Sequence, residues 1–142
     1  MTYKKLLAKG LIKSFKAEPS QIKDQLVIAH RDLKAAHEMM GKDNDWAYSI
    51  AYNALLQAAR ALMFREGYRP GGEGQHKTAI MFAQIALGRE FEDEIRFFDK
   101  MRIKRNQVVY DIAGLVSEEE AKQALEFAIK FIDRIQEELE EK

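Results

Sequence analysis

An arginine stands where the surrounding pattern of the chain places an apolar side chain. In the segment MRIKRNQVVYD (residues 101–111), apolar residues recur at helical spacing from Phe98 through Met101 to Val108, and Arg105 falls in the same row. Burying an unpaired guanidinium there would cost several kcal/mol. We therefore expect Arg105 to have a carboxylate partner, a wet cleft or an anionic ligand.

Three polar residues follow at steps of four beside Arg105. Arg102, Asn106 and Tyr110 share one stripe of the predicted helix, next to the row that contains Arg105. Two guanidinium groups, an amide and a phenol on one face suit the recognition of a phosphate or a base. The pattern therefore predicts a binding site for a nucleotide or RNA.

An internal ion pair is the alternative interpretation of Arg105. Asp32, Asp99 or an acidic residue of the last helix could be its partner. The protein would then be a structural interaction module with no ligand, and spacing alone leaves this alternative open.

His76 follows the one long loop signal of the sequence, GYRPGGEGQ at residues 67–75. The loop lacks the ending of a phosphate-binding loop, so we expect a flexible connector. His76 begins a helix, where it could meet an anion or simply act as a polar residue near the cap. Glu73 and His76 have the spacing of a di-iron motif, but glycines separate them and no second copy exists. We expect no metal site and no cofactor.

Composition excludes several classes of protein. The chain has 142 residues, which favours a single domain over residues 1–142, and it has no cysteine, so disulfides and thiol chemistry are excluded. No apolar run approaches the ~18 residues that span a bilayer, and lysines interrupt the apolar residues of the N-terminus, unlike in a signal peptide. Basic and acidic residues number 23 each, which predicts no general affinity for nucleic acid. We expect a cytoplasmic protein with no membrane association.

Apolar periodicity predicts an all-α protein. The expected helices cover residues 2–16, 22–40, 46–62, 76–87, 89–111 and 117–142. The first is a basic amphipathic helix within residues 1–18, and the last is acidic and begins with the capping box Ser117-x-x-Glu120. Ser20 is the expected N-cap of the second helix. No stretch alternates with period two, so we predict essentially no strand and an antiparallel up-and-down bundle of about five to six helices.

Several motifs, taken in order, resemble those of the HEPN family. Residues 29–36 (AHRDLKAA) resemble the A-x-x-D-L-x-x-A pattern of an early HEPN helix, and residues 47–62 resemble the alanine-rich helix that follows. A glycine, a short loop and a histidine come next, as at Gly67 and His76, and then an arginine-centred motif, here Arg105-Asn106-x-x-x-Tyr110. The resemblance spans roughly residues 22–139. It implies a bundle of about five helices that pairs with a second copy.

The resemblance also implies a function. HEPN ribonucleases cleave RNA without metal through an arginine and a histidine, and other members bind nucleotides or accompany a minimal nucleotidyltransferase in toxin–antitoxin pairs. Carried over, Arg105 takes the place of the family arginine, Asn106 that of the following polar residue and Tyr110 that of the histidine. A tyrosine that some HEPN toxins carry just beyond the histidine is replaced by Ile112.

The tyrosine at the histidine position favours binding over catalysis. Phenols ordinarily have a pKa near 10, so they are poor bases at neutral pH, and losing a general base typically costs ~10²–10⁴ in rate. We therefore predict a dimeric HEPN-type protein that binds a nucleotide or RNA through Arg102, Arg105, Asn106, Tyr110 and His76. It would be a prokaryotic toxin–antitoxin component with a nucleotidyltransferase partner. The alternative is a metal-independent endoribonuclease with Arg105, His76 and Tyr110 at its site, in which His76, or a histidine from the second subunit, replaces the missing base.

Overall fold

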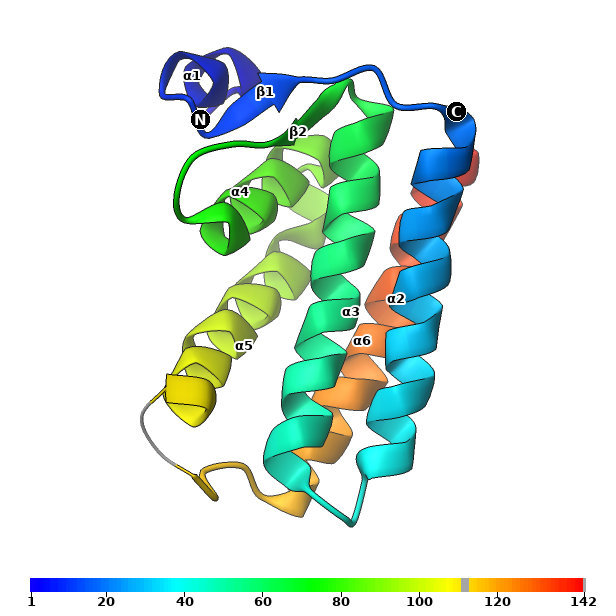
Figure 1. The fold of residues 1–142 in the computed structure, drawn as a ribbon, viewed down its shortest axis with the longest axis vertical. Helices are drawn as coiled ribbons and strands as arrows, with labels where there is room; N and C mark the ends of the chain where they lie inside the picture. Colours follow the sequence, from blue (N-terminus) through cyan, green and yellow to red (C-terminus); the bar gives the residue numbers. More distant parts are fainter. Residues whose placement is uncertain (111–112, 142) are drawn as a thin grey trace.

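The fold is a bundle of α-helices, as the sequence predicts (Figure 1). The computed structural model describes residues 1–110 and 113–141, so the part of the predicted site region at Asp111 and Ile112 lies outside the described residues. The described elements are α1 (Tyr3–Ala8), β1 (Ile12–Ser14), α2 (Pro19–Met39), α3 (Asn44–Arg65), β2 (Tyr68–Pro70), α4 (Gln75–Leu87), the 3₁₀ helix η1 (Arg89–Phe91), α5 (Glu92–Tyr110) and α6 (Glu118–Glu140).

The prediction of one helix over residues 2–16 is wrong, and the chain, which we expected to have essentially no strand, has a pair of three-residue strands. The helix α1 ends at Ala8, because Gly10 adopts a positive φ of 72° that turns the chain. The residues that follow form β1, which pairs antiparallel with β2 in the register Ile12 to Pro70 and Ser14 to Tyr68. Part of the predicted flexible loop at residues 67–75 is therefore a strand.

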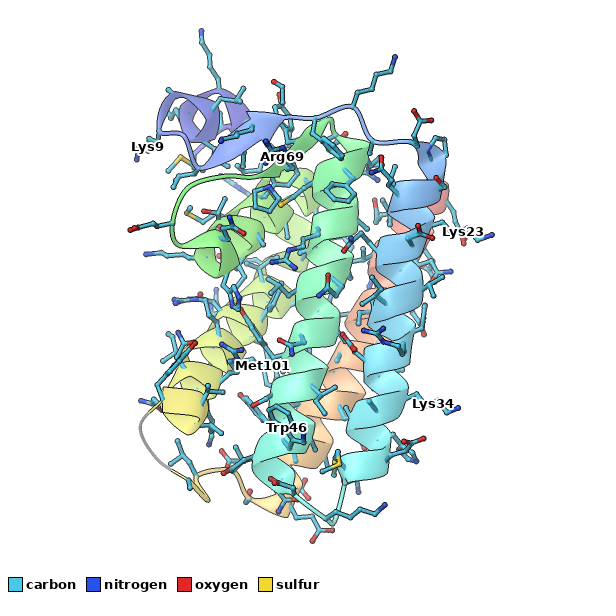
Figure 2. All side chains as sticks on the ribbon, viewed as in Figure 1. Lys9, Lys23, Lys34, Trp46, Arg69 and Met101 are labelled. Carbon is cyan, nitrogen blue, oxygen red and sulfur yellow. The ribbon has the colours of Figure 1, made fainter. Side chains whose placement is uncertain are left out.

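Helix α3 lies at the centre of the bundle. It packs against α2 and α6 on one side and against α4 and α5 on the other (Figure 1). Its alanines permit close approach of these neighbours, and the following ones are buried: Ala47, Ala51, Ala54, Ala58, Ala59 and Ala61. Lysines such as Lys23 and Lys34 extend away from α2, whereas Met101 of α5 is buried (Figure 2).

The predicted start of α6 is confirmed, whereas the predicted starts of α2 and α5 are not. The predicted capping box of α6 is present, since the Ser117 side chain accepts from the backbone of Glu120 at 3.1 Å and the Glu120 carboxylate accepts from the backbone of Ser117. The prediction of Ser20 as the N-cap of α2 is wrong: Glu18 is the N-cap and Pro19 is the first helical residue. Proline favours that position because its missing N–H is not needed there. The prediction that α5 begins near residue 89 is also imprecise, because residues 89–91 form η1.

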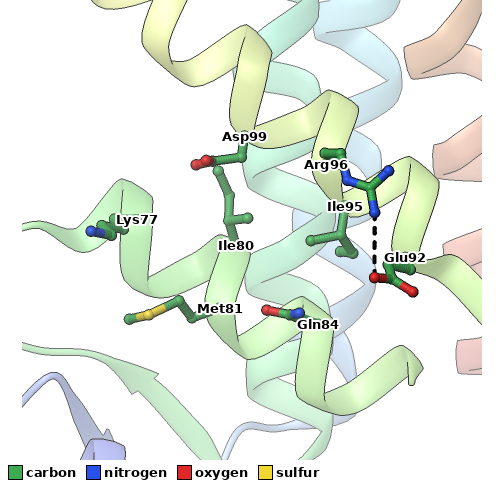
Figure 3. Close-up of a pocket in the computed structure, with 8 residues that line it drawn as sticks. All are labelled: Lys77, Ile80, Met81, Gln84, Glu92, Ile95, Arg96 and Asp99. Carbon is green, nitrogen blue, oxygen red and sulfur yellow. Dashed lines mark hydrogen bonds and ion pairs between the residues drawn. The ribbon is translucent and has the colours of Figure 1, made fainter. Parts of the chain in front are cut away.

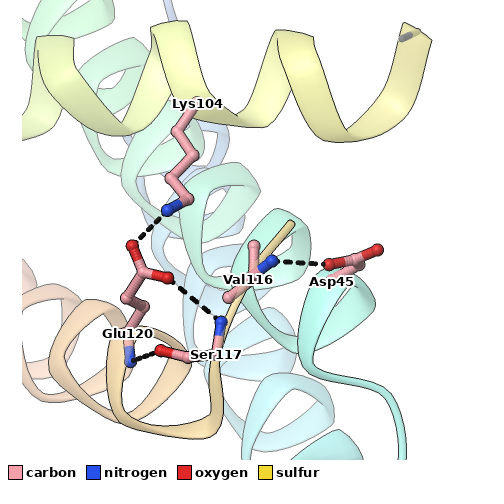
Figure 4. A network of polar contacts seen from close by, with 5 residues as sticks. All are labelled: Asp45, Lys104, Val116, Ser117 and Glu120. Carbon is pink, nitrogen blue, oxygen red and sulfur yellow. Dashed lines mark hydrogen bonds and ion pairs between the residues drawn. The ribbon is translucent and has the colours of Figure 1, made fainter. Parts of the chain in front are cut away.

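A small polar network joins the ends of α5 and α6 to the start of α3 (Figure 4). The Asp45 carboxylate accepts from the backbone N–H groups of Gly114 at 2.6 Å and Val116 at 3.1 Å. Lys104 of α5 forms an ion pair with Glu120 of α6, and this contact, followed by the one with Ser117, lowers the pKa of the Glu120 carboxyl. The Lys104–Glu120 pair thus ties α5 to the start of α6, and Asp45 ties the segment before α6 to the start of α3.

Removing the Asp45 carboxylate should destabilise the protein. We expect Asp45→Ala to lower the free energy of unfolding by about 1–3 kcal/mol, because two backbone donors lose a charged acceptor. Urea unfolding of this variant beside Asp24→Ala, which removes an exposed carboxylate from α2, measures the difference. Equal stability of the two variants would show that the network contributes nothing.

None of the helices in residues 1–110 and 113–141 combines the length and the apolar character needed to cross a membrane.

Candidate functional site

All five residues predicted for the site line one pocket. It lies between the start of α4 and the C-terminal half of α5 and has a volume of about 460 Å³. Its lining residues are Gly74, Gln75, His76, Lys77, Arg102, Arg105, Asn106 and Tyr110. The loop before α4 and the polar stripe of α5 therefore meet in space.

Arg105 is half-buried at the side of this pocket. Its Nε atom is enclosed and has no hydrogen-bond partner among the described residues. Its guanidinium carbon lies 5.9 Å from the centre of the Tyr52 ring, where a cation is attracted by the face of the ring. Arg105 thus packs on an aromatic ring and retains unused donors.

The internal ion pair proposed as the alternative is not found in residues 1–110 and 113–141. Asp32 contacts Arg31 at 3.6 Å, and the Asp99 carboxylate accepts from Arg102 Nε at 2.8 Å. The acidic residue of α6 that reaches α5 is Glu120, which pairs with Lys104. Asp32, Asp99 and Glu120 are therefore engaged with residues other than Arg105.

Arg102 is positioned by its pair with Asp99, one turn earlier on α5. The pair uses Nε of Arg102, which leaves the terminal nitrogens of the guanidinium to the pocket that this residue lines. Tyr110 is 73% exposed at the end of α5, and Asn106 is half-buried between them. This side of the pocket presents donors suited to the oxygens of a phosphate.

His76 enters the pocket from the first turn of α4. Gly74, the N-cap of α4, has a left-handed φ of 67°, which glycine adopts without strain. The backbone N–H groups at this helix start favour an anion. His76 Nδ1 lies 3.2 Å from the hydroxyl oxygen of Tyr52. Which of the two groups donates this hydrogen bond depends on the tautomer of the histidine ring.

The electrostatic environment keeps His76 neutral. Burial lowers the pKa of its imidazole, and the nearby cations Arg105, Arg60 and Arg102 lower it further. Burial also raises the pKa of the Tyr52 phenol. At neutral pH the pair is therefore an uncharged imidazole beside an uncharged phenol, surrounded by three arginines.

A comparison with protein families identifies the chain. The model of the HEPN domain matches residues 22–139. This chain belongs to the HEPN family. The resemblance seen in the sequence is therefore confirmed.

The fold of this HEPN domain is similar to that of a solved protein. The crystal structure of TT1696 from Thermus thermophilus matches with a TM-score of 0.63 over 82% of this chain and 97% of that one, at 20% sequence identity. Similarity at this level of identity concerns the fold alone. No curated protein matches the sequence.

Sequence reasoning missed two residues near the candidate site that lie on α3. Tyr52 holds His76, and Arg60 lies close enough to lower the pKa of that histidine. Both residues are on the same face of α3, because eight residues separate them. An arginine two turns after a tyrosine, within an alanine-rich helix, is the signal that could have revealed them. Lys77 was also missed, although it follows His76 directly.

The pH dependence of folding should report on His76. Because its pKa is lowered in the folded state from the ordinary 6.5, the unfolded chain binds more protons below that pH, and stability falls as the solution is acidified. We expect His76→Gln to lose less stability than the wild type between pH 7.5 and pH 5.5 in urea unfolding. The exposed His37→Gln variant is the control. If His76→Gln and the wild type showed the same pH dependence, the described environment of His76 would be wrong.

Proposed function

We propose that this HEPN protein binds a nucleotide or RNA, with a phosphate held in the pocket between α4 and α5. The observation that carries the proposal is the enclosed Nε of Arg105, which has no partner in the described residues and belongs to a side chain that lines an open pocket. A buried donor of this kind normally has an acceptor. A phosphate in the pocket would give the guanidinium of Arg105 an acceptor and offset its positive charge.

The other groups of the pocket support an anionic ligand. Arg102 and Lys77 line it, and Arg60 lies nearby. The start of α4 adds backbone donors. Asn106 and Tyr110 could hydrogen-bond to a ribose or stack on a neighbouring base of an RNA, as amide and aromatic side chains do in RNA-binding proteins.

We also propose that the protein is a homodimer. Three side chains of α5 near the pocket are exposed: Ile103 at 49%, Val109 at 43% and Tyr110 at 73%. A second copy would cover them and complete the surroundings of the pocket. Light scattering at several concentrations tests the dimer, and a strict monomer would contradict it.

We further propose that the protein acts beside a minimal nucleotidyltransferase in a prokaryotic toxin–antitoxin module, a role that rests on family membership.

Binding measurements at several salt concentrations test the main proposal. We expect a short labelled RNA and a mononucleotide to bind in the presence of EDTA, with the affinity falling linearly on a log–log plot against salt. Inorganic pyrophosphate should compete with both. If neither RNA, nucleotide nor pyrophosphate bound at low salt, the proposed function would be rejected.

A second candidate function is favoured by His76. In the tautomer that donates from Nδ1 to Tyr52, Nε2 of the neutral ring carries a lone pair and could take a proton from a ribose 2′-hydroxyl. Arg105 would then stabilise the charge that develops on the phosphate. Cleavage of RNA in EDTA that is lost in both His76→Gln and Arg105→Ala would favour this ribonuclease. RNA that is bound and left intact would favour binding alone.

A further inference from the structure

A second groove lies between α4 and α5 (Figure 3). Its volume is about 250 Å³. Lys77, Ile80, Met81 and Gln84 line it from α4, and Glu92, Ile95, Arg96 and Asp99 line it from α5. Lys77 lines both spaces, and Asp99 of the groove is paired with Arg102 of the pocket. The groove and the pocket are therefore neighbours, because they share Lys77 and are joined by the Asp99–Arg102 pair.

The groove has an apolar floor. Ile80 and Ile95 are buried, at 4% and 6% exposure, and face each other from the two helices. Met81 is half-buried beside them. A methionine side chain is flexible, and its sulfur makes favourable contacts with aromatic rings. A flat ring that lies on this floor would therefore exchange water for apolar contact.

Hydrogen-bonding groups stand around the floor. Asp99 accepts from Arg102 through Oδ1, and its side chain remains 42% exposed, so Oδ2 is available to the groove. The Gln84 amide is exposed and can both donate and accept. Glu92 and Arg96 pair with each other at 3.3 Å. Asp99 is thus the hydrogen-bond acceptor of the groove that lies nearest to the pocket with Arg102. A carboxylate of this kind prefers a donor such as an amino group.

We propose that the ligand is a nucleotide whose base lies in this groove, with its phosphate beside Arg102 and Arg105, and that the base carries an exocyclic amino group. The proposal rests on the proposed function and adds the subsite for the base. The apolar floor contacts the ring, and the Asp99 carboxylate accepts from the amino group. Bases without that group give Oδ2 of Asp99 no donor, although Oδ1 keeps its bond from Arg102, and they bind more weakly.

Three probes separate the base from the phosphate: AMP, IMP (which has a carbonyl oxygen in place of the amino group) and ribose 5-phosphate, which has no base. We expect the wild type to bind AMP at least about fivefold more tightly than ribose 5-phosphate, as base contacts of 1–3 kcal/mol imply, and more tightly than IMP. Met81→Ala should weaken AMP binding about threefold or more and leave ribose 5-phosphate binding unchanged. Calorimetric titration measures all three affinities.

Two further variants make the result unambiguous. Gln84→Ala changes an exposed side chain of the groove and is expected to fold normally while weakening AMP. Ile129→Ala removes a 42% exposed apolar side chain of α6, outside both spaces, and should change nothing. If AMP, IMP and ribose 5-phosphate bound equally, or if neither groove variant weakened AMP, the base subsite would be rejected and the phosphate site would stand. If no probe bound at all, the proposed function itself would fail.

Discussion

Arg105→Ala is expected to weaken nucleotide or RNA binding by about tenfold to more than a hundredfold, because hydrogen bonds to charged groups contribute about 1.5–3 kcal/mol. The same change should lower the free energy of unfolding by no more than about 1 kcal/mol. No ion pair of Arg105 exists in the described residues to be broken, and the loss is confined to its packing over Tyr52. Affinity measured at matched salt and urea unfolding give the two values.

Arg134→Ala is the matched control for this experiment. Arg134 also lies over an aromatic ring, with its guanidinium carbon 4.7 Å from the centre of Phe91, but it is on α6 and does not line the pocket. Its removal should leave the affinity unchanged. If Arg105→Ala instead destabilised the fold by about 3–5 kcal/mol and bound as tightly as the wild type, Arg105 would be a structural residue without a ligand.

Phe98→Ala is expected to lower the free energy of unfolding by about 3–5 kcal/mol, because it removes a large buried ring and leaves a cavity. Phe98 is fully buried, and its ring centre lies 5.8 Å from that of Tyr52 and 6.3 Å from that of Phe131. It therefore joins the core to the residue that holds His76. A loss of ligand affinity should accompany the loss of stability.

The exposed Ile129 provides the comparison for Phe98. Ile129→Ala should change the free energy of unfolding by less than about 0.5 kcal/mol, since surface substitutions rarely do more. Urea unfolding monitored by circular dichroism measures both variants. If Phe98→Ala lowered the free energy of unfolding by less than about 1 kcal/mol, Phe98 would not be packed against Tyr52 as described.

The helical part of the fold could be predicted because each long helix carries its own periodic pattern. In α2, apolar residues recur at alternating steps of three and four, as on one face of a helix, and Ala29, Leu33 and Ala36 of this row are buried. The β1–β2 pair could not be predicted in this way, since its hydrogen bonds join segments more than fifty residues apart in the chain. From Tyr3 to Phe15, apolar residues recur at every fourth position, as they would in one long helix. The chain nevertheless turns at Gly10, and the helix ends at Ala8.

The candidate site could be predicted where it follows from one helix. Arg102, Arg105, Asn106 and Tyr110 lie on adjoining rows of α5, and that relation is fixed by helical geometry. The contributions of α3 depend on how the helices cross, which local spacing does not determine, so Tyr52 went unnoticed. The Asp99–Arg102 pair, by contrast, joins residues three apart on α5, a spacing that helical geometry brings together.

The Nε–H group of Arg105 offers the most direct test of a phosphate held in the pocket. In a ¹⁵N spectrum of the arginine side chains, titration with AMP should shift the Arg105 and Arg102 Nε–H signals together until saturation and leave that of Arg134 unchanged. If the Arg105 signal stayed in place while the protein was saturated with the nucleotide, the ligand would bind elsewhere, and the account of this pocket would be contradicted.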